Sequence, residues 1–321
     1  MPVISDVTYR PILPLRNGHL NTFYPYLFRK RRVLPYIRER ILTPDDDFFD
    51  VDWCKSSESK KVAVLLHGLE GSSHSQYILG TAKALMDHGY HVAAINFRSC
   101  SGEMNHQIKM YHSGFTEDLL YFIDYIDGQY EEIYLCGFSL GGNVVMKYLG
   151  DQKKNISTKI KAAAGISVPC DLRACSLQLK KPENYLYEKN FTSSLMKKVM
   201  EKYRMFPDKI NLKNMDKITN MWSMDDYFTA PIHGFADAED YYAQCSSKNN
   251  LADIEIPTMI INALDDSFLA DESYPYEVAH MKENIYLMTP KYGGHVGFTT
   301  FGTPYYWNEM QILRFFELTS L

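Results

Sequence analysis

The stretch that decides the fold is Tyr134–Asn143, which reads Tyr-Leu-Cys-Gly-Phe-Ser-Leu-Gly-Gly-Asn. Its first residues belong to an apolar run typical of a buried strand, and the apolar residues that follow it have helical spacing. Gly137 and Gly141 bracket Ser139 in a G-x-S-x-G pattern. Because glycine has no Cβ, strand and helix can approach closely here. The stretch predicts a strand, a sharp turn that exposes the Ser139 hydroxyl, and a helix capped near Gly150.

The turn has the features of a nucleophile elbow. A helix beginning at Leu140 would point its free N–H groups and positive dipole end at negative charge forming beside Ser139. Three fixed positions in five residues also occur by chance, so a catalytic interpretation requires a base and an oxyanion hole elsewhere in the chain.

The composition excludes several classes of protein. The chain has 321 residues, of which 45% are hydrophobic and 23% charged, as in ordinary globular proteins. A net charge of -5 argues against nucleic acid as a partner. The sequence contains no run of 18 apolar residues, so no membrane span is predicted, and the N-terminus lacks an apolar signal core. Six cysteines without metal-type spacing predict a reduced, cytoplasmic protein with neither metal nor cofactor.

Strands and helices alternate along most of the chain, which predicts an α/β fold with a mostly parallel sheet and helices on both faces. The predicted strands span residues 38–42, 48–53, 62–66, 92–97, 133–136, 161–168, 259–263 and 285–288, and the predicted helices span 76–88, 119–126, 144–149 and 305–318. Residues 1–37 are expected to be irregular because five prolines interrupt them.

The alternation stops between residues 170 and 253, where the sequence is helical and polar. We therefore predict an N-terminal part of the core with an irregular arm (1–169), a helical cap (170–253) and a C-terminal part of the core (254–321). Aromatic side chains of the cap are expected mostly to pack against the core, with some lining an apolar acyl pocket.

Two backbone N–H groups are candidates for an oxyanion hole. The strand 62–66 runs into the flexible loop His67–Ser73. We expect the Leu69 N–H in this loop to pair with the N–H of Leu140, the residue after Ser139. Each such donor contributes about 3–4 kcal/mol to a tetrahedral oxyanion. The alternative is that His67 and Gly68 simply end a strand.

An acid and a base follow Ser139 in the chain order Ser…Asp…His. His295 would take the serine proton, and an aspartate would fix the imidazole tautomer. Asp266 is favoured as that acid, with Asp265 as a turn residue that bonds its own backbone. His112 is a rival base, but it precedes Ser139 and is interpreted as a loop residue beside the site.

The basic run Arg29-Lys30-Arg31-Arg32 has two interpretations. It is either a solvated turn, which is favoured, or a weak peripheral contact with anionic lipid head groups.

Motifs along nearly the whole chain resemble the YheT-like family of α/β-hydrolases. The stretches that carry the resemblance are Asn17–Thr22, His67–Ser72, Asn96–Arg98, Tyr111–Gly114, Thr116–Asp118, Gly137–Asn143, Thr229–Phe235, Asn262–Asp266 and Gly293–Phe298. This family includes hydrolase-domain acylglycerol lipases and phospholipases, and medium-chain ethanol acyltransferases. The resemblance implies a triad of Ser139, Asp266 and His295.

Two departures, Ser99 for the usual glycine and Ser267 for the usual proline, concern only loop shape. Eukaryotic relatives carry an N-terminal membrane anchor, and the sequence is expected to lack one. The resemblance therefore implies a soluble, bacterial-type member.

These observations predict a serine carboxylic-ester hydrolase that forms an acyl-serine intermediate. Its expected partners are short- to medium-chain esters, with monoacylglycerols among the candidates. One alternative is acyl transfer to an alcohol by the same residues. Another is a non-catalytic protein that binds an acyl ligand. The oligomeric state stays open.

Overall fold

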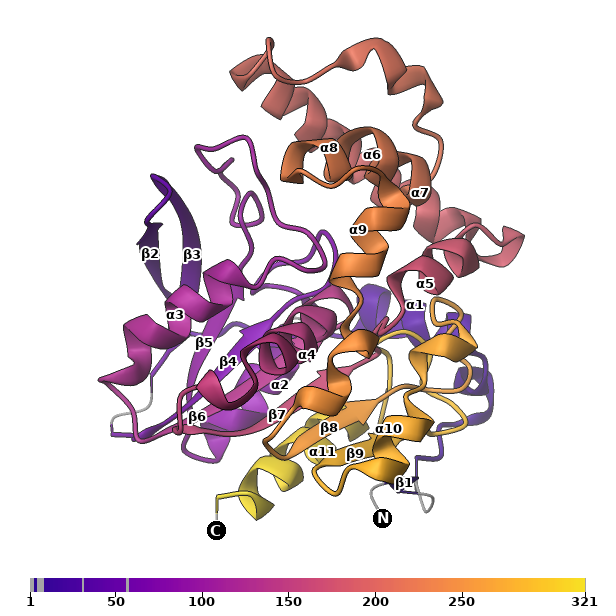
Figure 1. Ribbon diagram of the computed structural model, residues 1–321. Coiled ribbons are helices and arrows are strands. Elements are labelled where there is room, and N and C mark those ends of the chain that lie inside the picture. Colours follow the sequence, from indigo (N-terminus) through magenta and orange to yellow (C-terminus); the bar gives the residue numbers. More distant parts are fainter. Residues whose placement is uncertain (1–2, 5–8, 31, 56–57, 321) are drawn as a thin grey trace.

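The computed structural model describes residues 3–4, 9–30, 32–55 and 58–320, and these residues build one nine-stranded sheet (Figure 1). The strands are β1 (Val3–Ile4), β2 (Ile37–Thr43), β3 (Asp47–Cys54), β4 (Lys61–Leu66), β5 (His91–Asn96), β6 (Glu132–Phe138), β7 (Ile160–Ile166), β8 (Thr258–Ile261) and β9 (Ile285–Met288). Their order is β1-β9-β8-β7-β6-β4-β5-β3-β2. The β2–β3 and β3–β5 pairs are antiparallel and the remaining described pairs are parallel, which confirms the predicted mostly parallel sheet.

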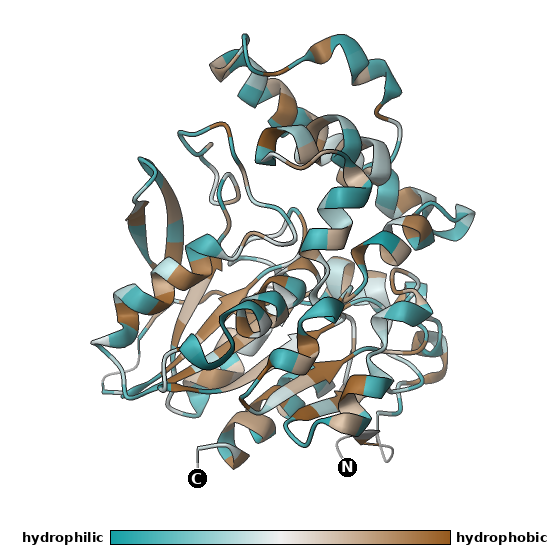
Figure 2. Ribbon diagram, in the orientation of Figure 1, coloured by the Kyte–Doolittle hydropathy of each residue, from teal (hydrophilic) through white to brown (hydrophobic). Residues whose placement is uncertain are grey.

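Helices cover both faces of this sheet. Helices α3 (Glu117–Asp127), α4 (Leu140–Gln152) and α10 (Tyr276–Met281) pack on one face, and α2 (Gln76–Asp87) and α11 (Trp307–Leu318) pack on the other. Figure 2 shows the apolar strands enclosed between helices whose outer sides are hydrophilic. This arrangement confirms the α/β class predicted from the alternation of strands and helices.

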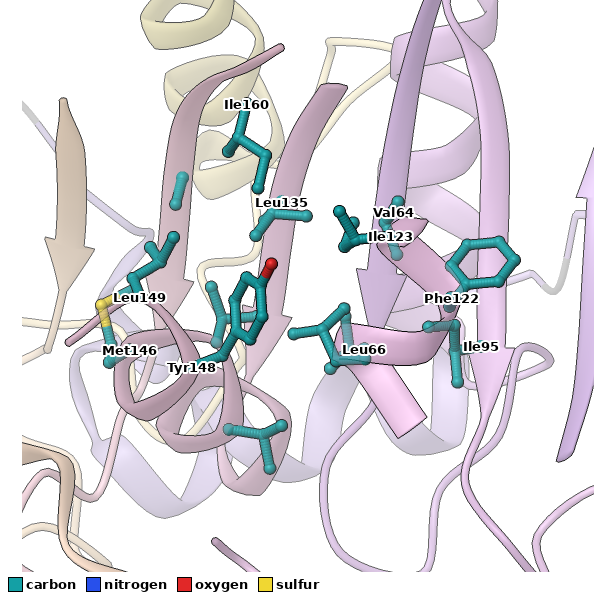
Figure 3. Close-up of a cluster of buried hydrophobic side chains, with 14 of the residues drawn as sticks. Val64, Leu66, Ile95, Phe122, Ile123, Leu135, Met146, Tyr148, Leu149 and Ile160 are labelled. Atoms are coloured by element: carbon teal, nitrogen blue, oxygen red, sulfur yellow. The ribbon is translucent and has the colours of Figure 1, made fainter. Parts of the chain in front are cut away.

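The central strands β4, β5 and β6 are apolar over most of their length, because both of their faces are buried. Val64 and Leu66 of β4 pack with Phe122 of α3 and Tyr148 of α4 in one apolar cluster (Figure 3). Leu65, between them, points into the second cluster on the opposite face. The central strands of the sheet are therefore buried on both faces, and they give the loops at the edge of the sheet a rigid base.

Between β7 and β8 the chain leaves the sheet and forms helices that stand over it (Figure 1). These helices are α5 (Leu172–Leu179), α6 (Tyr185–Met205), α7 (Met221–Met224), α8 (Ala230–His233) and α9 (Ala238–Cys245). They form two apolar clusters separate from those of the sheet. The division into core and cap, with its limits at 170 and 253, stays a prediction.

The N-terminal arm is more regular than the prolines indicated. Helix α1 (Gly18–Phe28) contains Pro25, so the expectation of irregular structure over residues 1–37 was wrong for this part. The Asn17 side chain caps the helix by accepting a hydrogen bond from the Leu20 N–H. The buried Asn21 amide donates to the Tyr9 hydroxyl and to the Leu15 carbonyl oxygen. Tertiary hydrogen bonds therefore override the low helix propensity.

Gly150 has a different role from the predicted cap. Helix α4 continues past it to Gln152. A Cβ on Gly150 would lie 2.4 Å from the carbonyl oxygen of Asn250, in the segment that returns from the cap. The glycine is therefore needed for close backbone approach rather than for helix termination.

We expect Gly150→Ala to lower the free energy of unfolding by about 1–3 kcal/mol, because the added methyl group overpacks this contact. Gly128→Ala is the matched control: nothing lies within 4 Å of a Cβ there, and its φ of −70° suits alanine. The control should be neutral or more stable by about 0.4–1 kcal/mol. Urea unfolding of both variants makes the comparison, and equal stabilities would contradict the packing role of Gly150.

Candidate active site

Ser139 occupies a strained turn between β6 and α4. Its φ of 52° and ψ of −120° lie outside the regions that L-residues prefer. Such a conformation costs on the order of 1–3 kcal/mol and persists only where surrounding structure enforces it. Here the enforcement is close packing, because a Cβ on Gly137 would lie 2.2 Å from the Gly141 carbonyl oxygen and one on Gly141 would lie 2.5 Å from that of Leu66.

Three side chains that the sequence places far apart meet at this turn. His295 Nε2 lies 2.9 Å from Ser139 Oγ. His295 Nδ1 lies 2.8 and 3.1 Å from the two carboxylate oxygens of Asp266, whose side chain is fully buried. The carboxylate therefore holds the proton on Nδ1 and leaves Nε2 to accept the hydroxyl hydrogen of Ser139. This arrangement can deprotonate the serine.

The imidazole is held by contacts that the sequence did not indicate. The Phe268 ring stacks on that of His295 at 4.1 Å between centroids and 23° between planes. The backbone N–H of His295 donates to Thr22 Oγ1 of helix α1 at 2.8 Å. Thr22 lies within a quoted motif, but the sequence assigns it no role. Helix α1 is thus part of the support of the site.

Asp265 also supports the histidine loop. Its carboxylate accepts a hydrogen bond from the Gly294 N–H at 2.8 Å, in addition to contacts with its own backbone. Burial raises the pKa of Asp265 to about 6. The carboxylate next to it, on Asp266, is the one that reaches the imidazole. The two neighbouring aspartates therefore have different tasks, one toward the loop backbone and one toward the ring.

The predicted oxyanion loop lies directly against the serine. A Cβ on Gly68 would be 3.1 Å from Ser139 Cβ. The Gly68 N–H donates to the Tyr77 hydroxyl, and the Glu70 N–H donates to the Tyr111 hydroxyl. The structure shows no hydrogen bond to the amide of Leu69 within the described residues. These two bonds fix the peptides His67–Gly68 and Leu69–Glu70, which flank the peptide that carries the Leu69 N–H.

The N–H of Leu140 stands at the first turn of helix α4, and within the described residues it too has no hydrogen-bond partner. Leu69, Leu140 and Ser139 line one cavity together. Their assignment as oxyanion donors stays a prediction.

A partly buried ion pair links this loop to the cap. The Glu70 carboxylate lies 2.7 Å from Lys198 Nζ of helix α6 and also accepts from Ser194. Burial alone would raise the pKa of Glu70, but the charge of Lys198 lowers it overall. The Tyr111 hydroxyl donates to the same carboxylate at 2.8 Å. Sequence analysis did not find this network, because its members are distant in the chain and show no spacing pattern.

His112 is not placed to act as the base. Its Nδ1 accepts a hydrogen bond from the Gly114 N–H at 3.1 Å, and its ring packs against His233 at 4.5 Å. Burial, with His233 as a further cause, lowers the pKa of His112 well below its ordinary value. It is a neutral loop residue beside the site, as the sequence analysis interpreted it.

Two cavities meet at the serine. The larger, of about 570 Å³, lies between helix α1, the oxyanion loop and helix α6. The smaller, of about 120 Å³, extends under the cap. Residues that line both are Leu69, Ser139, Phe191, Phe268 and His295. An ester carbonyl at Ser139 can therefore direct one substituent into each cavity.

The described residues hold no cluster of three or more potential metal ligands. Among the same residues, no helix combines the length and apolarity that crossing a bilayer requires.

The sheet, the elbow and the Ser–His–Asp geometry define an α/β hydrolase. The family model described as "alpha/beta hydrolase fold" matches residues 62–300. The chain is 35% identical to "Putative esterase YheT" of Escherichia coli, over 96% of this chain and 92% of that protein. It is 30% identical to "Phospholipase ABHD3" of Bos taurus, over 92% of this chain and 74% of the relative.

The chain therefore belongs to the YheT-like family of α/β hydrolases, and its similarity is to proteins named as an esterase and a phospholipase. Among solved structures, an esterase of Pyrococcus furiosus superposes with a TM-score of 0.59 at 18% identity, covering 89% of this chain and 91% of that one. This similarity concerns the fold.

We expect Asp266→Asn to lower kcat by about 10⁴-fold, because an amide no longer holds the proton on Nδ1 of His295. Asp265→Asn is the control, since its Oδ1 can still accept from the Gly294 N–H. The kcat of this control should fall by less than about tenfold. Steady-state kinetics on a p-nitrophenyl ester measures both, and the reverse ranking would contradict the role of Asp266.

Proposed function

We propose that the protein is a serine carboxylic-ester hydrolase that acts through an acyl-Ser139 intermediate. The observation that carries this proposal is the continuous hydrogen-bonded chain from Asp266 through His295 to Ser139 Oγ. A serine hydroxyl is a poor nucleophile at neutral pH unless a base takes its proton. The histidine stands within hydrogen-bond reach of that proton.

The reaction follows from these positions. Ser139 Oγ attacks the ester carbonyl carbon while His295 takes the hydroxyl proton. The Leu69 and Leu140 N–H groups stabilise the resulting oxyanion. The C–O bond to the alcohol then breaks, and the imidazolium returns its proton to the leaving alkoxide. A water molecule, deprotonated by His295, releases the carboxylic acid and regenerates the serine.

The sizes of the two cavities support a short acyl group. The smaller cavity has a volume of about 120 Å³, compared with about 570 Å³ for the larger one. It is lined mainly by apolar and aromatic side chains, including Leu172, Met221 and Tyr242. We assign the acyl chain to this cavity and the alcohol portion to the larger one. Short- to medium-chain esters fit this assignment, with monoacylglycerols among the candidates.

We expect a fluorophosphonate probe to label the protein at Ser139, because the probe captures an activated serine nucleophile. Ser139→Ala should remain unlabelled, as read by intact-protein mass spectrometry. Labelling of the alanine variant at the same rate would end the nucleophile assignment. The same variant should hydrolyse p-nitrophenyl esters no faster than a protein-free control.

Added alcohol separates hydrolysis from acyl transfer by the same residues. If ester hydrolysis is the main activity, p-nitrophenyl butyrate with ethanol present should yield mainly butyrate. Ethyl butyrate as the main product would favour the acyltransferase. Loss of all turnover with an intact fold would favour a ligand-binding protein.

We expect Met221→Ala to shift the preferred p-nitrophenyl ester toward longer acyl chains, because Met221 lines the smaller cavity and truncation enlarges it. Met224→Ala is a matched control, since Met224 is buried in the same helix but lines neither cavity. Both variants should lose stability by about 2–5 kcal/mol. The ratio of kcat/KM for octanoate over butyrate should rise in Met221→Ala alone, and an unchanged ratio would contradict the acyl assignment.

A further inference from the structure

Helix α1 presents its apolar side chains to solvent instead of to the core. The residues that it buries are Asn21 and Pro25. Leu20, Leu27 and Phe28, in contrast, are 50%, 61% and 66% exposed. A surface helix of a soluble domain normally turns its apolar stripe inward. The rest of the described chain therefore leaves these three apolar side chains of α1 uncovered.

The apolar surface continues beyond α1. Phe23 of α1 stacks on Tyr187 of α6 at 4.8 Å, so the start of the cap lies against the helix. Next to Tyr187, Leu186 is 67% exposed. On another side, Tyr24 contacts the exposed ring of Phe301 at 5.5 Å. We call the set Leu20, Tyr26, Leu27, Phe28, Leu186 and Phe301 the α1 patch.

Two residues of the α1 patch also border the larger cavity. Tyr26 and Leu186 belong to the patch and also line that cavity, which leads to Ser139. Thr22, on the same helix, holds the backbone of His295. A partner that binds the α1 patch would therefore lie next to the larger cavity, through which a substrate can reach Ser139.

The chain segment that contains helix α1 is basic. Residues 7–38 contain seven lysines and arginines and no acidic residue, although the whole chain has a net charge of -5. Arg16 and Lys30, beyond the two ends of α1, are exposed. Arg29 is engaged elsewhere, because both carboxylate oxygens of Glu309 bind its guanidinium. The expectation of a solvated turn over residues 29–32 was therefore wrong for Arg29, and Arg31 lies outside the described residues.

We propose that the α1 patch docks the protein on an anionic lipid surface, with the entrance of the larger cavity facing the lipid. Apolar side chains that enter the head-group boundary, surrounded by basic residues, are the chemistry of an interfacial helix. Basic residues near an anionic bilayer add to the attraction. A second copy of this chain is a poorer occupant, because a symmetric contact would bring the two cationic segments together.

Only the consequence of docking, which is delivery of an ester from the lipid layer to Ser139, rests on the proposed esterase function. Docking itself needs no catalysis. The test therefore uses Ser139→Ala protein, so that binding is measured without turnover. We expect it to sediment with phosphatidylcholine vesicles that contain phosphatidylglycerol, at least about tenfold more strongly than with pure phosphatidylcholine vesicles.

Two changes probe the surface separately. Leu20→Ser with Leu27→Ser should weaken sedimentation at least about tenfold by removing apolar contact, and Lys30→Ala should weaken it about fivefold. Leu42→Ser is the matched control: Leu42 is 68% exposed, but it lies on β2 at the other edge of the sheet. This control should sediment as the parent does.

Three results would overturn the docking proposal: no sedimentation with anionic vesicles, equal sedimentation of the double serine variant, or a dimer in analytical ultracentrifugation that this variant dissociates. In otherwise wild-type protein, the double variant should hydrolyse dissolved p-nitrophenyl acetate at the normal rate but lose activity on an ester embedded in anionic vesicles. Failure of the esterase proposal would instead remove both activities and leave the sedimentation unchanged.

Discussion

The close contact of helix α4 with β4 and β6 is the constraint on which the rest of the structure depends. Gly137 and Gly141 allow backbones to meet where any side chain would collide, and Ser139 is left with a positive φ. The serine backbone is pinned on both sides, since its N–H donates to Ile166 and its carbonyl oxygen accepts from Asn143. The strain is thus held by the sheet, whose two buried faces resist adjustment.

The same helix also fixes the parts that complete the site. The Asn143 amide donates to the carbonyl oxygens of Ser113 and Cys245 and accepts from the Ser247 N–H. One buried side chain therefore connects the elbow helix with the loop after β5 and with the end of the cap. The histidine loop depends on a different set of contacts, because Thr22 and Asp265 hold its backbone from two separate segments.

The sheet and the meeting of three side chains at the elbow could be predicted from patterns in the sequence. Apolar runs specify buried strands, and the chain order of Ser139, Asp266 and His295 at strand ends places them at one edge. Helix α1 was missed because Pro25 argues against a helix, and because Asn21 bonds to Tyr9 and accepts from the Thr299 N–H, which lie outside the helix. Phe268 and Lys198 were missed for a similar reason. Stacking on an imidazole, or pairing with Glu70 across the cap, leaves no periodic signal in the sequence.

The Glu70–Lys198 ion pair couples the position of the cap to that of the loop beside Ser139. Lifting helix α6 would separate this ion pair and break the hydrogen bond that Ser194 donates to Glu70. If the cap is displaced, the loop therefore loses part of its support. By reciprocity, a ligand that orders the loop also stabilises the position of the cap. The larger cavity, which lies beside helix α1, is accordingly a route by which a substrate can reach Ser139 without displacement of the cap.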